Sequence, residues 1–335
     1  MENMERLKIL ITGGTGFVGA NLVRFFLANG HEVATTVRKE SNKWRISDIL
    51  RDTNLFTIDL TDQQKVNDLY TSYKPDVIIN TVAYGGYHFE TDMKRMINVN
   101  FNATVNLVEA YLKSDSQLLI NTGSSSEYGF KQKPMSENDV LEPFGIYAVS
   151  KAAATLYCRS RSIETHKKIV TFRLFSAYGD YEESHRLIPY LMMSFLKNQK
   201  AELNNPNNIR DYIYVKDINN AYNEMIRKTD FIDFGEILNL GSGLETKVSD
   251  IVDLVEKISQ RKIKINWQYN IERIGDRVTN WVSNMSKTHK TLNWKPRYSL
   301  EEGLSETYKW FEKNANKYEV TENSKFKRVS EGNTY

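Results

Sequence analysis

Short apolar runs alternate with longer amphipathic segments through the first half of the chain. Apolar runs rich in β-branched residues predict strands, and the amphipathic segments between them predict helices. The predicted strands are Leu7–Thr12, Glu32–Val37, Leu55–Asp59, Val77–Asn80, Leu118–Thr122 and Ile169–Phe175. This alternation predicts a Rossmann-type α/β domain, a doubly wound parallel sheet of about six or seven strands with its ligand site at their carboxyl ends.

Predicted helices fill the gaps between these strands. One opens near Gly16, a second begins near Asp62, and two long helices cover Asp92–Lys113 and Tyr147–Thr165. A further helix is expected at Leu187–Asn198, after the strand and helix rhythm has changed. The second half therefore predicts a second, smaller and less regular α/β lobe.

The domain boundaries follow from the same pattern. We expect residues 1–176 to form the first domain and residues 177–314 to form the smaller lobe. The strand-like segments Tyr212–Val215 and Ile237–Leu240 are expected to return to the first domain, so that 212–240 belongs to it. Residues 315–335 lose apolar periodicity, which predicts a mobile tail.

Composition narrows the class of protein. The chain has 335 residues, 40% of them hydrophobic, and its 45 Lys and Arg against 42 Asp and Glu give a net charge of +3. This balance predicts neither a nucleic-acid nor a membrane partner, and no apolar run approaches the roughly 18 residues of a membrane helix. The single cysteine, Cys158, excludes an intrachain disulfide and favours a reducing compartment. We expect a cytoplasmic protein, and no metal site is predicted.

A glycine-rich loop, "ITGGTGFVG", follows the first predicted strand and opens the first helix. Gly13, Gly16 and Gly19 allow a tight turn, a close approach to a pyrophosphate and packing of the helix on the sheet. The helix N-terminus adds free N–H groups and the positive end of the helix dipole. The loop, including Thr15, Phe17 and Val18, is therefore predicted to bind a dinucleotide.

The end of the second strand bears on the choice between NAD and NADP. The stretch "EVATTVRKES" has no carboxylate at the strand end to bind the ribose hydroxyls of NAD, and it offers Arg38, Lys39 and Ser41 instead. These donors favour a 2′-phosphate, and hence NADP(H), although a solvated basic turn beside bound NAD(H) remains open. Asp59 and Leu60 at the third strand and Ala83 after the fourth are candidates for the adenine and ribose sides.

Tyr147 and Lys151 in "YAVSK" lie four residues apart, so they share one face of the predicted helix. An ammonium about 4 Å from a phenol contributes about 4 kcal/mol at an effective dielectric constant of 20, enough to lower the phenol pKa by two to three units. We therefore expect Lys151 to lower the pKa of Tyr147 and to hold a ribose hydroxyl. Their position after the dinucleotide loop makes this pair a candidate for catalysis.

These motifs, together with "NVNFNATVNLVEA", "GSSSEYG", "IRDYIYVKD", "LNLGSG", "ERIGD" and "LNWKPRYSLEEGL", resemble the extended short-chain dehydrogenase/reductase family. More narrowly, they resemble its nucleotide-sugar epimerase, dehydratase and 4-ketoreductase group, up to about Asn314. The resemblance implies that Ser124, Tyr147 and Lys151 form the catalytic triad, with Tyr147 as acid and base. It also implies cofactor roles for Asn100, in the helix behind the cofactor, and for Phe175.

The resemblance further implies a nucleotide-diphosphate sugar as the substrate. Arg210 and Arg273 match positions that contact the phosphates of the substrate in related enzymes, and Arg186 is a weaker candidate. Ser125 and Ser126 are expected to face the substrate or to be structural, and Ser176 stands where many relatives have an asparagine facing the sugar.

The prediction of the reaction rests on the absence of a carboxylate at Ser126, just after the fifth predicted strand. The 4,6-dehydratases of this group carry a carboxylate where this chain has Ser126, and a serine cannot protonate a leaving hydroxyl as an acid can. Because the basic turn favours NADPH and the serine cluster resembles the CDP-abequose synthase type, we predict reduction of a nucleotide-linked 4-keto-6-deoxyhexose at C4, in deoxysugar or surface-glycan biosynthesis. A 4-epimerase with bound NAD is the first alternative. A dinucleotide-binding sensor without activity is the second.

Two expectations complete the sequence analysis. The family commonly dimerises through a four-helix bundle, which implies a homodimer through Asp92–Lys113 and Tyr147–Thr165. Glu127 lies one position too late to be the dehydratase acid, and the sequence gives it no role beyond a possible bond to backbone N–H groups.

Overall fold

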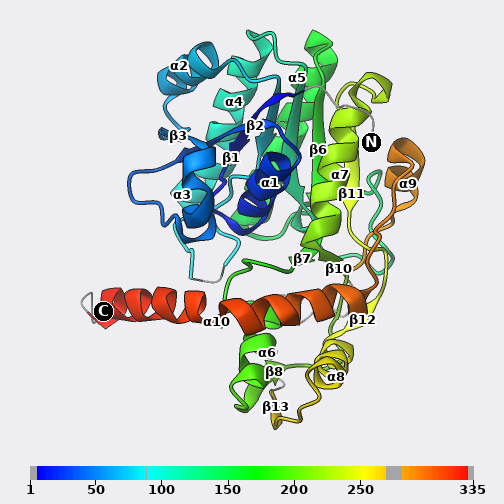
Figure 1. Cartoon of the computed structure of the whole chain (residues 1–335). Coiled ribbons are helices and arrows are strands. Elements are labelled where there is room, and N and C mark those ends of the chain that lie inside the picture. Colours follow the sequence, from blue (N-terminus) through cyan, green and yellow to red (C-terminus); the bar gives the residue numbers. More distant parts are fainter. Residues whose placement is uncertain (1–5, 88, 269–280, 331–335) are drawn as a thin grey trace.

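The larger part of the molecule is built on a seven-stranded parallel sheet (Figure 1). The computed structural model describes residues 6–87, 89–268 and 281–330, with side chains described as far as residue 318. The strands run in the order β11-β6-β5-β4-β1-β2-β3, which confirms the predicted doubly wound sheet. Their bounds are β1 Lys8–Thr12, β2 Glu32–Val37, β3 Asn54–Thr57, β4 Val77–Asn80, β5 Leu118–Ser124, β6 Ile169–Leu174 and β11 Ile237–Leu240.

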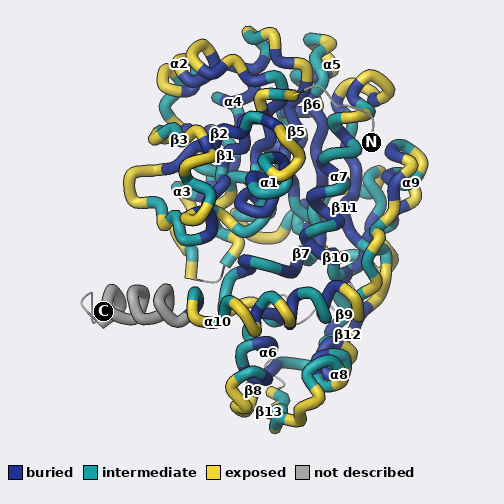
Figure 2. The backbone as a smooth tube through the Cα atoms, viewed as in Figure 1, coloured by how far each residue is buried: buried dark blue, intermediate teal, exposed yellow. Residues whose placement is uncertain are grey.

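Helices cover both faces of the sheet because successive strand residues point to opposite sides. On one face, Ile9 and Ile11 of β1 pack with Phe26 of α1 and Met225 of α7. On the other face, residues of the sheet pack with α2, α4 and α5. Figure 2 shows the strands buried between these layers. The bounds are α1 Phe17–Ala28, α2 Gln63–Tyr73, α4 Ala103–Leu112, α5 Gly145–Thr165 and α7 Val215–Arg227.

The long helix expected at Asp92–Lys113 is interrupted. It consists of α3 (Met93–Ile97), a π-helical segment η2 (Asn98–Asn102) and then α4. The π-helical segment contains Asn100, which is fully buried. Sequence periodicity did not predict this segment, because a single π-helical turn inside an α-helix is too short to be recognised in the apolar pattern.

The smaller lobe packs around its own apolar core of α6 (Leu187–Leu196), α8 (Val248–Ser259) and α10 (Leu300–Ser330). Three two-stranded sheets belong to this half of the chain, pairing β7 with β10, β9 with β12 and β8 with β13. Their bounds are β7 Ser176–Tyr178, β8 Ala201–Asn204, β9 Ile209–Arg210, β10 Tyr212–Tyr214, β12 Thr246–Lys247 and β13 Ile265–Gln268. The remaining elements are α9 Ser286–Leu292 and the 3₁₀ helices η1 Trp44–Asp52, η3 Ser125–Tyr128 and η4 Thr229–Phe231.

The second half of the chain contributes to both parts of the molecule. β11 pairs with β6 in the large sheet and α7 packs on its face, whereas β10 pairs only with β7 among the described strands. α10 crosses between the sheet and the smaller lobe (Figure 1), and its helix includes residues that were expected to begin a tail. Tyr318 of α10 is buried. The domain boundaries and the mobility of the tail stay predictions.

Candidate active site

A cavity of about 940 Å³ opens at the carboxyl ends of the sheet strands, where a doubly wound fold binds its ligands. It is lined by the loops that follow β1, β2, β3, β4 and β6. The predicted site residues that line it are Gly13, Thr15, Gly16, Phe17, Val18, Gly19, Arg38, Ser41, Asp59, Leu60, Ala83, Tyr147, Phe175 and Arg186. Other predicted residues lie outside this lining, namely Lys39, Asn100, Ser124, Ser125, Ser126, Lys151, Ser176 and Arg210. Arg273 lies outside the described residues.

The glycine loop has the compact shape that a diphosphate requires. Gly13 has a positive φ of 76°, and a Cβ on Gly19 would lie only 2.3 Å from the Gly13 carbonyl oxygen. α1 begins directly after Gly16, and no side chain caps its first N–H groups. The first turn of α1 therefore offers uncapped donors at the cavity wall, which fits the diphosphate of a dinucleotide.

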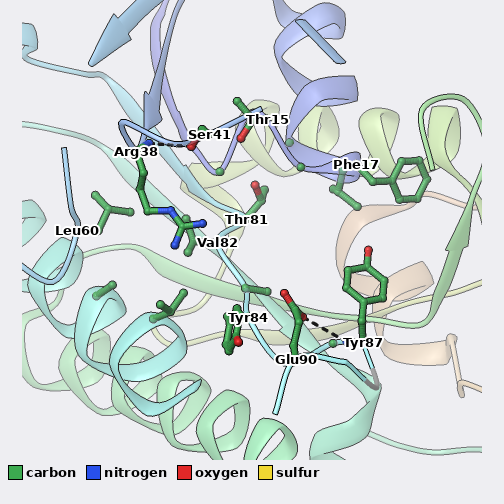
Figure 3. Close-up of a pocket in the computed structure, with 18 of the residues that line it drawn as sticks. Thr15, Phe17, Arg38, Ser41, Leu60, Thr81, Val82, Tyr84, Tyr87 and Glu90 are labelled. Carbon is green, nitrogen blue, oxygen red and sulfur yellow. Dashed lines mark hydrogen bonds between the residues drawn. The ribbon is translucent and has the colours of Figure 1, made fainter. Parts of the chain in front are cut away.

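The turn after β2 carries the charged residues that are expected to determine whether NAD or NADP binds. Arg38 extends into the cavity between Leu60 and Val82 (Figure 3). Its backbone N–H donates to Ser41 Oγ at 2.8 Å, and its Nε lies 3.3 Å from Glu40 Oε1. Both side chains of this ion pair are exposed. Arg38 thus remains available to an anionic ligand.

Asn100 supports the cavity from behind. Its Oδ1 accepts from the Tyr84 N–H at 2.8 Å, and its Nδ2 donates to Ser150 Oγ at 2.9 Å. These bonds join the loop after β4 to α5. Because Asn100 lies outside the cavity lining, its contribution to a cofactor site is to fix Tyr84 and Ser150.

Tyr147 lies in the first turn of α5, and Ser124 ends β5. Burial raises the pKa of the Tyr147 phenol, and its hydrogen bond with Ser124 opposes this rise. The expected direction was therefore wrong for this structure, because desolvation outweighs the groups that favour the phenolate. Ser124 thus lies beside the Tyr147 phenol, and the catalytic role of the pair stays a prediction.

Lys151 is buried one turn further along α5. Its Nζ donates to the Thr122 carbonyl oxygen of β5 at 2.5 Å. Burial lowers the pKa of the Lys151 ammonium, and the Glu127 carboxylate opposes this change. Lys151 is thus held against the strand that carries Ser124.

The three serines of the strand end differ in their contacts. Ser126 Oγ lies 2.8 Å from Ser124 Oγ, so it adjoins the catalytic candidate. Ser125 Oγ accepts from Trp281 Nε1 at 2.8 Å and is buried, which makes it a structural residue. Ser176 begins β7 and pairs with Tyr212 of β10.

The sequence analysis missed several residues of the cavity. Tyr84, Tyr87 and Glu90 come from the loop after β4, across the cavity from Thr15 (Figure 3). Glu90 Oε2 accepts from the N–H groups of Gly85 and Tyr87 at 2.8 and 3.3 Å, which fixes this loop. The aromatic loop "YGGYHFE" was a usable signal, because a long polar and aromatic loop after a parallel strand faces the ligand site.

Arg45 was missed without any signal in the sequence. Its side chain is buried and donates to the Tyr181 carbonyl oxygen at 2.7 Å and to Glu183 Oε1 at 2.6 Å. A further bond reaches the Thr15 carbonyl oxygen at 3.3 Å. Arg45 therefore links the glycine loop to the loop that enters the smaller lobe, a contact between segments far apart in sequence.

The model of the NAD dependent epimerase/dehydratase family matches residues 9–241, and the chain belongs to this family. A UDP-glucuronate 4-epimerase of Thermodesulfobacterium geofontis is 25% identical, over 91% of this chain and 96% of its own. The fold resembles that of a Thermotoga maritima UDP-glucose 4-epimerase solved with UDP-glucose, with a TM-score of 0.84, 22% identity, and coverage of 92% of this chain and 100% of that one.

A second solved structure of similar fold is that of an enzyme named for a different reaction. A dTDP-glucose 4,6-dehydratase of Bacillus anthracis, solved with NAD, has a TM-score of 0.81 at 23% identity and covers 92% of this chain and 98% of its own. The resemblance to the extended nucleotide-sugar enzymes is thereby confirmed. None of the described helices is long and apolar enough to span a membrane.

Proposed function

We propose that the protein is a nucleotide-sugar 4-epimerase that uses a nicotinamide dinucleotide. The observation that carries the proposal is the Ser124–Tyr147 pair beside a cavity lined by the glycine loop, in a chain whose named relatives include UDP-glucuronate and UDP-glucose 4-epimerases. Our sequence prediction favoured a 4-ketoreductase, and these relatives favour the alternative. Both reactions exchange a hydride at C4 of a sugar.

The side chains of this site suit proton transfer at the sugar C4 oxygen. A bound nicotinamide supplies and accepts the hydride. Tyr147 can return a proton to the C4 oxygen when the carbonyl is reduced, because a raised pKa keeps the phenol protonated at neutral pH. In the oxidation step it would take the C4 hydroxyl proton only as the phenolate, so this step requires that ligand binding lowers the pKa of Tyr147. Ser124 donates a hydrogen bond to the C4 oxygen. Lys151 is fixed against β5 by its bond to the Thr122 carbonyl oxygen, which places an ammonium on the same helix face as Tyr147.

A 4-ketoreductase acting with NADPH is the second candidate. It is favoured by Arg38 and Ser41 in the cavity wall, at a strand end without a carboxylate for the ribose of NAD. A 2′-phosphate suits the guanidinium of Arg38. A reductase must exchange its nucleotide at every turnover, whereas an epimerase can keep it.

Two other reactions are disfavoured. A 4,6-dehydratase needs an acid at the position of Ser126, whose hydroxyl is already within hydrogen-bonding distance of Ser124. An inactive sensor would have no need for Ser124, Tyr147 and Lys151 together.

The substrate is proposed to be a nucleoside-diphosphate sugar. Arg186 lines the cavity and lies at the start of α6, with Nε 3.5 Å from Glu182 Oε1. Its guanidinium suits a phosphate, and we propose the same role for Arg210 and Arg273. The proposed homodimer would use α5, which exposes Ile146, Val149, Leu156 and Ile163. A monomer in light scattering at micromolar concentration would contradict it.

One experiment separates the two candidate reactions. The purified protein is denatured to release any nucleotide, and the native protein is incubated with UDP-glucose and UDP-glucuronate without added nucleotide. An epimerase releases NAD and interconverts C4 epimers, detected by proton NMR. A reductase releases none and oxidises NADPH with a panel of nucleotide-linked 4-keto-6-deoxyhexoses, with NADH as the control. Failure of both assays would contradict the proposed function.

A further inference from the structure

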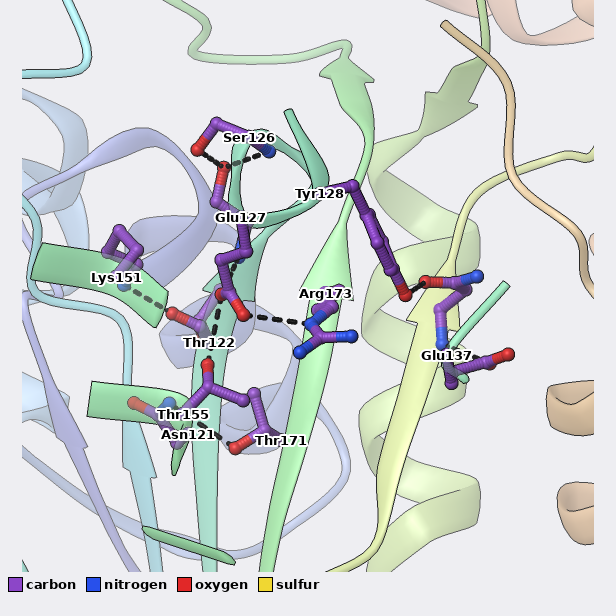
Figure 4. A network of polar contacts seen from close by, with 12 residues as sticks. Asn121, Thr122, Ser126, Glu127, Tyr128, Glu137, Lys151, Thr155, Thr171 and Arg173 are labelled. Atoms are coloured by element: carbon purple, nitrogen blue, oxygen red, sulfur yellow. Dashed lines mark hydrogen bonds and ion pairs between the residues drawn. The ribbon is translucent and has the colours of Figure 1, made fainter. Parts of the chain in front are cut away.

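Glu127 is a fully buried carboxylate with partners on three elements. Its Oε1 accepts from the Ser124 N–H at 2.8 Å and from Thr155 Oγ1 at 2.9 Å. Its Oε2 accepts from Arg173 Nε at 2.8 Å (Figure 4). A buried carboxylate of this kind persists only because several donors compensate its lost hydration. The site is therefore built around the charge of Glu127.

Gly123 leaves the space that this carboxylate occupies. A Cβ at Gly123 would lie 2.6 Å from Glu127 Oε1 and 2.8 Å from Thr171 Cγ2. A contact below about 3 Å would displace the carboxylate from its donors. Gly123, the last residue but one of β5, and Glu127 four residues later thus form one local arrangement.

Glu127 joins the two elements that bear the catalytic candidates. Ser124 ends β5, and Thr155 lies on α5 one turn after Lys151. A single oxygen of Glu127 accepts from both, so the strand end and the helix share an acceptor. We propose that Glu127 is a positioning residue that fixes Ser124 relative to Tyr147 and Lys151, an inference that rests on the proposed chemistry at C4.

Arg173, which donates to the other oxygen of Glu127, makes further contacts of its own. Arg173 of β6 lies over the Tyr128 ring, with its guanidinium carbon 4.6 Å from the ring centroid. The Tyr128 hydroxyl donates to Asn239 Oδ1 of β11 at 2.6 Å. The carboxylate is thereby anchored through β6 to β11, and it does not depend on the cavity for its position.

Two double variants test the positioning role. Glu127→Gln/Arg173→Met keeps an acceptor for Ser124, whereas Glu127→Met/Arg173→Met keeps a side chain of similar length without one. Both remove the two buried charges together, which avoids leaving one unpaired. We expect both to fold, and kcat of the methionine variant to be about tenfold or more below that of the glutamine variant, since small displacements in an active site cost this much. KM should agree within about twofold, because the proposed substrate contacts are elsewhere.

Controls separate positioning from stability and from the proposed function. Asp217→Asn alters a buried carboxylate that accepts from the Arg297 N–H at 2.8 Å, far from the triad in sequence, and should change the melting temperature without changing kcat. Exchange of the Ser124 amide hydrogen, measured by NMR, should be faster in the methionine variant than in the glutamine variant. Equal kcat in the two double variants would overturn the proposal. If the wild type turned over no substrate, the proposed function would fail, and equal amide exchange would then overturn the positioning role by itself.

Discussion

The two ends of the candidate site, at β5 and at β2, contain ion pairs of opposite kinds. At the β5 end, Glu127 and Arg173 are 0% and 2% exposed and are held by further hydrogen bonds. At the β2 end, Arg38 and Glu40 are 46% and 64% exposed and lie 3.3 Å apart. A buried pair is costly to form and costly to break, whereas an exposed pair contributes little either way.

This difference matches the tasks of the two ends. Proton transfer requires Ser124 and Tyr147 in one fixed geometry, which a rigid buried network provides. Nucleotide selection requires a cation that can exchange one anionic partner for another, which the exposed Arg38 provides. The ion pair beside the proposed reaction centre is thus buried, and the one at the proposed nucleotide end is exposed.

The largest expected effect tests the rigid end. Tyr147→Phe removes the phenol hydroxyl that bonds to Ser124 and keeps the ring. We expect the rate of the C4 reaction to fall by about 10²–10⁴-fold, the usual contribution of a general acid and base. Nucleotide binding, measured by fluorescence, should be preserved and serves as the control. A variant that reacts at the rate of the wild type would exclude Tyr147 as the acid and base.

The sequence predicted the parts of the site that depend on local chain geometry. Gly13 and Gly19 shape a turn, and Tyr147 and Lys151 share a helix face, so a short stretch of sequence contains each motif. The sequence also anticipated that Glu127 bonds to a backbone N–H, which is that of Ser124. The ion pairs of Arg45 and Glu127, in contrast, depend on partners 138 and 46 residues away. Such pairs form only when the sheet brings distant segments together, and no local pattern encodes them.

The pKa of Tyr147 was mispredicted for a related reason. The spacing of Lys151 specifies one favourable charge, but the desolvation of the phenol depends on how the whole cavity wall packs. In the structure, Lys151 is bonded to the Thr122 carbonyl oxygen of β5. Spacing thus places Tyr147 and Lys151 on one face of α5 and does not determine their electrostatics.

The next largest expected effect is a pH dependence of stability caused by Glu182, a buried carboxyl group with fewer partners than Glu127. Glu182 is 4% exposed and its Oε2 has no hydrogen-bond partner among the described residues, unlike Glu127. Burial raises the pKa of Glu182 from 4.5 to about 8, although Arg186 opposes this rise. Between these values the folded chain holds a proton that the unfolded chain has released, so stability falls as the pH rises from 4.5 to about 8 and is level above it.

Glu182→Gln should remove this part of the pH dependence. We expect the free energy of unfolding, obtained from urea titrations, to fall less between pH 4.5 and 8 in the variant than in the wild type. The difference should reach up to a few kcal/mol. Asp180, with a pKa raised to about 6, leaves a residual slope at lower pH in both proteins. The exposed Glu202→Gln is the matched control and should keep the slope of the wild type. Parallel pH profiles for Glu182→Gln and wild type would show that Glu182 is ionised when folded.

A smaller effect tests the adaptable end. Arg38→Ala should weaken NADPH binding by about 10- to 100-fold, the loss expected for a charged hydrogen bond of about 1.5–3 kcal/mol, and should change NADH binding by less than about threefold. Isothermal calorimetry measures both. Lys39→Ala is the control, because Lys39 is exposed and lies outside the cavity lining. Equal losses for the two nucleotides would argue that Arg38 does not select the 2′-phosphate.

The smallest effect sharpens the contrast between the two ion pairs. Glu40→Gln removes the exposed partner of Arg38, and we expect the free energy of unfolding to change by less than about 1 kcal/mol, because water screens both side chains. Urea unfolding in low and high salt measures this change, which should shrink further as salt is added. A loss of several kcal/mol that persisted in high salt would mean that the β2 turn is as rigid as the β5 end, and the division of labour between the two ends would then be wrong.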